Sequence, residues 1–302
     1  MNSFERKPSS NGPIALFAGR LRLELIPSVG GAISAFEWVD GESAHPIMRK
    51  CHSPVEKVLD ACSFPLVPYV NRIRDGSFCF RGSEVHLKPN MAGDPSPLHG
   101  QGWLNPWRVE SAGQNSAVLT YQHESGEWPW RYEARQLFAI DERGLTLTLT
   151  CRNLADEPMP CGLGQHPYFP CGPETRIDTQ VTHAWTVDDK VLPVARVPAE
   201  GRYDLKARRV CGQGLDNGFG GWGGEARMSD PQWPFELRLS SSSAHFFQVY
   251  SPPEGGIFVA EPVTHANAAL NAPEEQWPDL GLKVLQAGEE MSLPMRLDVS
   301  AR

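Results

Sequence analysis

Leu145-Thr146-Leu147-Thr148-Leu149-Thr150 is the stretch that most clearly predicts the fold. Leucine and threonine alternate strictly, and successive side chains of a β-strand point to opposite faces. One face of such a strand is apolar and the other polar, and β-branched threonine suits a pleated surface. We therefore expect a half-buried strand with its leucines on a hydrophobic core.

The same period of two recurs along the chain. It appears in 21–25, 235–239 and 295–299. Glycine-containing turn signals separate such runs, as in Asp141-Glu-Arg-Gly144 and Glu254-Gly-Gly256. Helical periodicity is hard to find, and 28 Gly and 27 Pro in 302 residues leave little room for long helices. The pattern predicts an all-β sandwich or barrel rather than a βαβ fold.

Length and composition narrow the class of protein. A chain of 302 residues with 40% hydrophobic and 21% charged residues can bury a large core, and no linker-like stretch divides it, so we expect one domain over 1–302. A formal charge of −8 argues against a nucleic-acid partner. No apolar run approaches a membrane span, and Met1–Ser10 lacks the apolar segment of a secretory signal.

Cysteine and histidine usage indicates neither disulfides nor a metal. The seven cysteines are odd in number and form no C-x-x-C pair or zinc-ligand spacing. Free thiols in a reducing compartment are the simplest interpretation, which makes cytoplasm the expected location. The nine histidines show no close pairing in ligand spacing, so no metal or other cofactor is expected.

His166 lies in the stretch with the most unusual local chemistry, Gly162-Leu-Gly-Gln-His-Pro-Tyr-Phe-Pro170. A residue before proline is pushed to an extended conformation, so we expect His166 to end a strand with its imidazole projecting outward. Tyr168 and Phe169 are expected to form an aromatic wall beside it. The alternative is a buried, hydrogen-bonded and inert histidine.

Two earlier segments also carry polar groups beside apolar ones. Asn71-Arg72 follows the apolar run 64–69, where a guanidinium can project into a cleft and donate several hydrogen bonds. His99 lies among small residues near Trp103, and an imidazole beside an indole suits a sugar. The alternatives are a surface arginine and a tryptophan that only fills the core.

Three later residues complete the set of candidates. Asp216 lies in a glycine-rich segment and is either a hydroxyl acceptor or an Asx-turn residue. Gln248 and Glu261 each occur in an otherwise apolar strand-like run. A buried charge is costly unless it is paired, solvated or used, so Glu261 is the carboxylate expected to do chemistry. A solvated glutamate at a sheet edge is the alternative.

Taken in order, these segments resemble the aldose 1-epimerase (mutarotase) family. The similarity covers about Gly30 to the C-terminus and includes the closing stretch Gly281-Leu-Lys-Val-Leu-Gln-Ala-Gly-Glu289. The motifs that carry it are Asn71-Arg72, Leu98-His99-Gly100, His166-Pro-Tyr-Phe169, Asp216, Gln248 and Glu261-Pro262. The resemblance implies a large antiparallel β-sandwich of the galactose mutarotase-like type, with an open cleft across one sheet.

By that resemblance Glu261 would be the general base and His166 the general acid. Arg72, His99, Asp216 and Gln248, together with Asn71, would hold a small-molecule sugar without a cofactor. The segment Val263-Thr-His-Ala-Asn-Ala268 departs from the family pattern, and the chain is shorter than the best-known galactose mutarotases. Both departures leave the preferred sugar open. The stretches around Asn71 and His166 look closest to a bacterial branch of the family.

Other functions stay open at this stage. A sugar-phosphate (hexose-6-phosphate) 1-epimerase would need further cations near the cleft, for which Arg74 and Lys88 are the candidates. A non-catalytic sugar-binding protein is possible on the same fold. A glycoside hydrolase would need two facing carboxylates, such as Glu261 and Asp216. The sequence reveals neither the particular aldose nor the oligomeric state.

Overall fold

The computed structural model describes residues 12–51 and 54–302, and this part of the chain is built from β-strands. It contains 25 strands and six short 3₁₀ helices, with no α-helix among the described residues. The prediction of an all-β fold is confirmed. The expectation for Met1–Ser10 lies outside the described residues.

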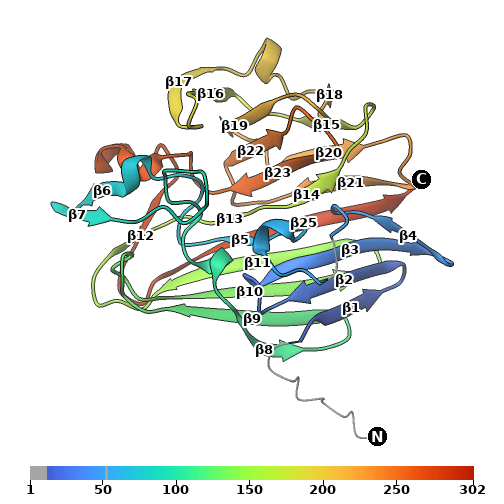
Figure 1. Cartoon of the computed structure of the whole chain (residues 1–302), viewed down its shortest axis with the longest axis horizontal. Coiled ribbons are helices and arrows are strands. Elements are labelled where there is room, and N and C mark those ends of the chain that lie inside the picture. Colours follow the sequence, from blue (N-terminus) through green and yellow to red (C-terminus); the bar gives the residue numbers. More distant parts are fainter. Residues whose placement is uncertain (1–11, 52–53) are drawn as a thin grey trace, which may run out of the picture.

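A nine-stranded antiparallel sheet forms one layer and extends from β18 and β15 to β8 (Figure 1). Its strands, in spatial order, are β18 (Arg208–Arg209), β15 (Arg176–Thr179), β20 (Glu225–Ser229), β21 (Phe235–Ser240), β25 (Glu290–Ala301), β11 (Gly144–Asn153), β10 (Tyr132–Asp141), β9 (Ser116–His123) and β8 (Arg108–Ala112).

An eight-stranded antiparallel sheet forms the layer that carries the candidate residues. Its order is β17 (Pro193–Pro198), β16 (His183–Val187), β19 (Leu215–Gly220), β22 (Phe246–Ser251), β23 (Ile257–Val263), β13 (Gly164–Gln165) and β5 (Pro65–Leu66), with β14 (Tyr168–Pro170) also paired to β23.

Smaller elements complete the sandwich. A four-stranded sheet, β1 (Ile14–Ala18), β2 (Leu21–Ile26), β3 (Ala32–Asp40) and β4 (Ser43–Pro46), contacts β10. Two pairs are β6 (Ser77–Phe80) with β7 (Ser83–His86), and β12 (Met159–Cys161) with β24 (Lys283–Leu285). The 3₁₀ helices are η1 (Val58–Asp60), η2 (Arg74–Gly76), η3 (Gly102–Leu104), η4 (Gly201–Tyr203), η5 (Ala269–Asn271) and η6 (Glu274–Gln276).

The alternating stretch 145–150 lies in β11, near the middle of the nine-stranded sheet. Leu145, Leu147 and Leu149 are buried, and the threonines between them are half-buried. Phe138 of β10 and Met295 of β25 lie directly opposite Leu147 on the two neighbouring strands. Period-two alternation therefore places the leucines in the core, as the sequence predicts.

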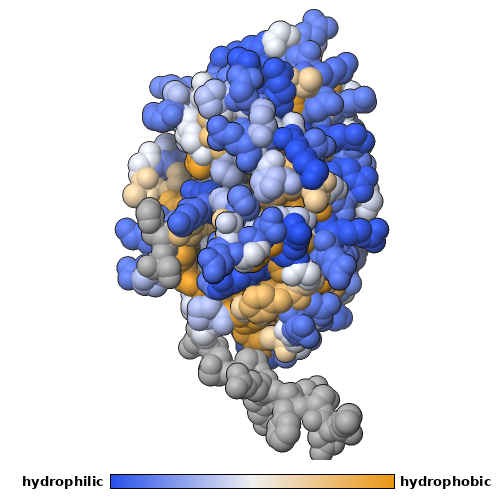
Figure 2. Space-filling model, turned by 90° about the vertical axis from the view of Figure 1, so that its right-hand side faces the viewer, coloured by the Kyte–Doolittle hydropathy of each residue, from blue (hydrophilic) through white to orange (hydrophobic). Residues whose placement is uncertain are grey.

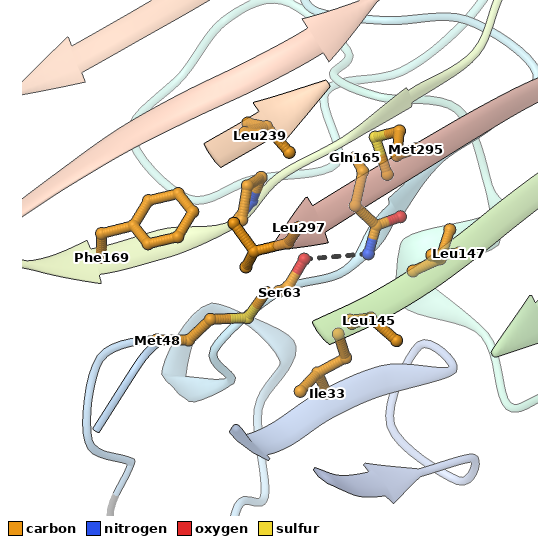
Figure 3. Close-up of a pocket in the computed structure, with 11 residues that line it drawn as sticks. Ile33, Met48, Ser63, Leu145, Leu147, Gln165, Phe169, Leu239, Met295 and Leu297 are labelled. Carbon is orange, nitrogen blue, oxygen red and sulfur yellow. Dashed lines mark hydrogen bonds between the residues drawn. The ribbon is translucent and has the colours of Figure 1, made fainter. Parts of the chain in front are cut away.

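Between the layers the packing leaves a small cavity, of about 20 Å³, which is enough space for about one water molecule. Figure 3 shows it lined by apolar side chains of the sheets and by Gln165, whose Nε2 donates to Ser63 Oγ at 2.9 Å. Gln165 thus points into the interior. Its neighbour His166 belongs to the opposite face of the same chain segment, which is the face that carries the candidate site.

The side chains on the surface contrast with those of the apolar core. Figure 2 shows one face of the molecule, on which hydrophilic side chains predominate and smaller hydrophobic areas lie between them. No described helix is long and apolar enough to cross a bilayer.

Replacing a core aromatic tests this packing. Phe247 is fully buried on β22 and stacks on Trp222, with ring centroids 4.8 Å apart. We expect Phe247→Ala to lower the free energy of unfolding by about 3–5 kcal/mol in urea denaturation, because it removes a large buried side chain and leaves a cavity. Phe17, which is 48% exposed, is the matched control, and Phe17→Ala should change it by about 0.5 kcal/mol or less. Equal effects would contradict the core assignment.

Candidate active site

The seven candidate residues line one cleft, of about 300 Å³. They are Asn71, Arg72, His99, His166, Asp216, Gln248 and Glu261. The first and the last of them, Asn71 and Glu261, are 190 positions apart in the sequence and thus meet in one place. Their convergence is what a ligand site requires, since such sites combine a concave surface with a few convergent polar groups.

Three neighbouring strands supply the carboxylates and the amide of the cleft. Gln248 of β22 pairs in register with Glu261 of β23 on one side and with Gly218 of β19 on the other. A Cβ atom on Gly218 would lie 3.2 Å from Gln248 Oε1. Glycine therefore leaves room for the amide, whose Nε2 donates to Asp216 Oδ1 at 2.8 Å.

Glu261 and His166 face each other, with Nε2 of the imidazole 3.2 Å from Oε1 of the carboxyl group. Their side chains are only 3% and 12% exposed, respectively. The backbone N–H of His166 donates to the Phe64 carbonyl at 3.0 Å, and its ring stacks on Phe64 with centroids 4.6 Å apart. The imidazole is thus fixed against the carboxyl group.

The aromatic wall beside His166 differs in part from the sequence expectation. Tyr168 flanks the imidazole, with centroids 4.7 Å apart, as predicted. Phe169 does not, because alternation along β14 turns it into the core, where it stacks on Phe258 at 5.3 Å. Phe64, which the sequence interpretation did not single out, forms the other side of the wall.

Burial sets the electrostatics of this pair. Desolvation raises the pKa of Glu261 well above its usual value, and the Asp216 carboxylate adds to the rise. Desolvation also lowers the pKa of His166 to about 3. Both directions favour the charge-neutral form of the pair, a carboxylic acid beside a neutral imidazole, over a carboxylate beside an imidazolium.

Each member of the pair also has an unused polar atom. Glu261 Oε2 and His166 Nδ1 are buried without a hydrogen-bond partner among the described residues. Leaving a buried polar atom unpaired costs free energy, so such atoms in a cleft are suited to meet a polar ligand. A sugar hydroxyl or ring oxygen is a group of that kind.

Arg72 is held in place by a carboxylate that the sequence interpretation missed. Its Nε donates to Asp94 Oδ2 at 2.8 Å, and its Nη1 donates to Asn71 Oδ1 at 3.1 Å. Asp94 is as buried as Arg72 and also accepts from the Ser96 backbone N–H. In sequence, Gly93-Asp94-Pro95 reads as a turn, and only the folded chain shows its partner.

His99 has a defined tautomer. Its Nδ1 accepts a hydrogen bond from the Asn71 backbone N–H at 3.0 Å, which places the ring proton on Nε2. Burial lowers the pKa of His99 well below its usual value, and the nearby His166 contributes. A neutral imidazole with one N–H remaining can donate to a ligand oxygen. Trp103 lines the same cleft, but its Nε1 donates to the Leu98 and Gly100 carbonyls rather than outward.

Besides a β-bridge between Arg72 and Leu98, side chains fix the segment 70–74, which carries Asn71 and Arg72. His265 Nε2, Asn267 Oδ1 and Asn271 Oδ1 accept from backbone N–H groups at 2.9, 3.2 and 2.7 Å; the donors are Val70, Arg72 and Arg74, respectively. We call these three residues the 265–271 clamp. The unusual stretch 263–268 therefore has a structural role beside the cleft.

Other expected cations do not join the cleft. Lys88 pairs with Glu127 at 3.1 Å on the surface, and Arg74 donates to the Pro193 carbonyl at 3.2 Å. Tyr250, opposite Asp216 on β22, does line the cleft and was not predicted. Within the described ranges, no group of three or more His, Cys, Asp or Glu residues could hold a metal ion.

Comparison with known proteins gives a consistent result. A family model described as aldose 1-epimerase matches residues 19–298. The chain is 34% identical over 295 residues to the uncharacterized protein YphB of Escherichia coli K12, covering 93% of this chain and 96% of that protein.

Two solved structures are similar over nearly their whole length. One is a candidate aldose 1-epimerase from Escherichia coli K12, with a TM-score of 0.85, 32% identity, and coverage of 96% of this chain and 99% of that one. The other is a galactose mutarotase-like protein from Clostridium acetobutylicum, with a TM-score of 0.83, 18% identity, and coverage of 99% and 98%. The second likeness shows the fold alone, and it confirms the predicted galactose mutarotase-like sandwich.

Removing one acceptor of the 265–271 clamp tests its role. Asn267→Ala leaves the Arg72 backbone N–H without its partner and also removes a donor to the Val191 carbonyl. We expect a loss of about 1–3 kcal/mol in the free energy of unfolding, measured in urea. Asn115 is exposed, and Asn115→Ala serves as the control. If both variants were as stable as the parent protein, the hydrogen bonds of Asn267 would not contribute to the free energy of unfolding.

Proposed function

The chain belongs to the aldose 1-epimerase family, and we propose that it is itself a mutarotase, an isomerase that interconverts the α and β anomers of an aldose. The observation that carries the proposal is the buried pair formed by Glu261 and His166, 3.2 Å apart in a cleft lined by hydroxyl-binding groups. The same chemistry needs neither a metal nor a redox cofactor.

Mutarotation requires two coupled proton transfers. One proton leaves the anomeric hydroxyl while another reaches the ring oxygen, so that the bond between C1 and the ring oxygen opens. The aldehyde end then rotates, and the ring closes on either face. We assign Glu261 as the base for the hydroxyl and His166 as the acid for the ring oxygen, each worth about 10²–10⁴-fold in rate.

The single proton of the pair fits both halves of this cycle. Ring opening starts from the ionised form, with a Glu261 carboxylate and a protonated His166. Once one proton has been taken and the other given, the pair is left as a carboxylic acid and a neutral imidazole. Burial favours that charge-neutral form, as the pKa directions of both groups indicate. The pair therefore reaches the ionised form by moving a proton from Glu261 to His166, and ring opening returns it to the favoured form. Ring closure returns both protons.

The remaining polar groups are suited to hold the sugar. Arg72 and the Nε2–H of His99 are donors that stabilise negative charge developing on oxygen. Asp216, whose carboxyl pKa is raised by burial and lowered in part by Arg72, accepts from hydroxyls together with Gln248. Asn71 is anchored by His99 through its backbone and by Arg72 through its amide.

A neutral sugar fits this lining better than a sugar phosphate. Among the described residues that line the cleft, Arg72 is the only Lys or Arg, and Asp94 already balances its charge. Arg74 and Lys88, which a phosphate-acting enzyme was expected to use, lie elsewhere.

We also propose that the chain acts as one domain, because one continuous core draws residues from Leu16 to Val299.

Exchange kinetics test the proposal directly. NMR exchange between anomers should be accelerated over buffer for at least one of glucose, galactose, arabinose and fucose, and less for glucose 6-phosphate. We expect Glu261→Gln and His166→Asn each to lower kcat by more than about 100-fold, with KM changing less, because each removes a proton-transfer group.

Glu127→Gln is the matched control, since Glu127 is a carboxylate at the surface. It should keep the parent kcat. A near-parent kcat in either cleft variant would remove that residue from the mechanism. Sugar binding without any faster exchange would instead favour a non-catalytic carbohydrate-binding protein.

The pH dependence should reflect the buried pair rather than an ordinary histidine. The one-proton form persists from the lowered pKa of His166, about 3, up to the raised pKa of Glu261. We therefore expect kcat/KM to stay level as the pH falls through about 6.5, where an unperturbed imidazole gains its proton. A decline of kcat/KM centred near that pH would show that His166 titrates as an exposed group.

A further inference from the structure

Two cysteines that do not line the cleft lie unusually close together. Sγ of Cys51 and Sγ of Cys62 are 2.7 Å apart, which is closer than two unbonded sulfur atoms normally pack and longer than the roughly 2.05 Å of a disulfide bond. Both are free thiols here. The sequence gives no hint of this, because 11 positions separate them and no C-x-x-C pattern marks them.

The local backbone holds the two thiols in this position. Cys62 Sγ lies 3.0 Å from the carbonyl oxygens of Ser34 and of Arg49. The backbone of Arg49 donates to the Tyr168 carbonyl at 2.8 Å, and Tyr168 donates to the Cys62 carbonyl at 2.9 Å. The segments that carry Cys51 and Cys62 are therefore both fastened to Tyr168.

Arg49 adds a second connection between the same segments and a positive charge beside the thiols. Its Nε donates to the Ala61 carbonyl at 2.9 Å, and its guanidinium lies over the Tyr168 ring at 3.7 Å. A cation beside a thiol favours the thiolate, which is the nucleophilic form. The hydrogen bond with Cys62 lowers the pKa of Cys51, and Arg49 contributes to the effect, while the same contact and burial raise the pKa of Cys62.

The exposure of the two sulfur atoms also makes Cys51 the more reactive thiol. Cys51 is half-buried and Cys62 is fully buried. A small oxidant can reach the first, and the second is in place to react with the product. Cys79 is exposed but belongs to no such contact. Cys151 and Cys161 are both buried away from solvent.

We propose that Cys51 and Cys62 form a site of oxidative modification, at which hydrogen peroxide converts the two thiols into a disulfide. The Cys51 thiolate attacks the peroxide, so that an S–O bond forms, the O–O bond breaks and hydroxide leaves. The hydroxide takes up the proton that the Cys51 thiol released and becomes the first water. The Cys62 sulfur then attacks the Cys51 sulfur. An S–S bond forms, the S–O bond breaks, and a second water leaves with the Cys62 proton. Two thiols lose two electrons, and one peroxide is reduced to two waters.

The disulfide between Cys51 and Cys62 would cross-link a segment that forms part of the wall of the cleft. Leu59 lies within the loop that it closes, and Phe64 follows Cys62 by two positions; both line the cleft, and Phe64 stacks on His166. A cross-link restricts the unfolded chain, so the oxidised protein should be the more stable form. The proposal does not depend on the epimerase reaction.

Peptide mapping of the full-length protein tests the site. Trypsin cuts after Lys50, Lys57 and Arg72, so Cys51 and Cys62 fall in different peptides, 51–57 and 58–72, each with one cysteine. After brief treatment with hydrogen peroxide and alkylation of the remaining thiols, mass spectrometry should find these two peptides joined, and dithiothreitol should separate them. Recovery of both peptides singly and alkylated, at a peroxide dose that oxidises Cys79, would overturn the proposal.

Variants sharpen the result. Cys51→Ser, at the half-buried position, should abolish the joined peptides, whereas Cys79→Ser should leave them unchanged. Peroxide should raise the melting temperature of the parent protein and of Cys79→Ser by about 5 °C, and it should leave that of Cys51→Ser unchanged. An equal rise in Cys51→Ser would show that another pair is responsible, and would contradict the assignment.

Discussion

A carboxyl group buried beside an imidazole is the constraint on which the site depends. Glu261 lies on an interior strand, out of contact with bulk water, where a lone carboxylate is costly. That cost raises the pKa of Glu261 and favours its protonated form, which faces a neutral His166 imidazole at 3.2 Å, so that the pair carries no net charge. The stacked ring of Phe64 fixes the imidazole at that distance. The cleft can therefore hold an acid–base pair away from bulk water while the pair remains able to transfer protons.

Two kinds of scaffold bring the other groups to this pair. Neighbouring strands of the eight-stranded sheet set Asp216, Gln248 and Glu261 side by side through their register. On the opposite side, Asn71 and Arg72 lie outside the eight-stranded sheet. A β-bridge between Arg72 and Leu98 holds this segment together with the 265–271 clamp, which accepts backbone N–H groups. A mutarotase needs donors and acceptors on several sides of a small ring, and the combination of sheet and clamp provides them.

The sequence predicted the fold well because period-two alternation is local. The leucines of β11 face the core as their pattern indicates. The candidate residues were harder, since each had a plausible structural role by itself, and only their order along the chain pointed to one cleft. Asp94 was missed because its partner lies 22 residues away and nothing in a Gly-Asp-Pro turn indicates it. Phe169 was misassigned because strand alternation turns it inward, and Phe64 takes its place.

The most direct test of the shared proton is an NMR titration of the two side chains in the ligand-free protein. The Glu261 carboxyl carbon and the His166 ring nitrogens can be labelled and assigned by comparison with Glu261→Gln and His166→Asn. The structure predicts a protonated carboxyl and a neutral imidazole between about pH 5 and 7, where ordinary carboxyl groups are ionised and ordinary imidazoles titrate. A carboxylate beside an imidazolium over that range would contradict it.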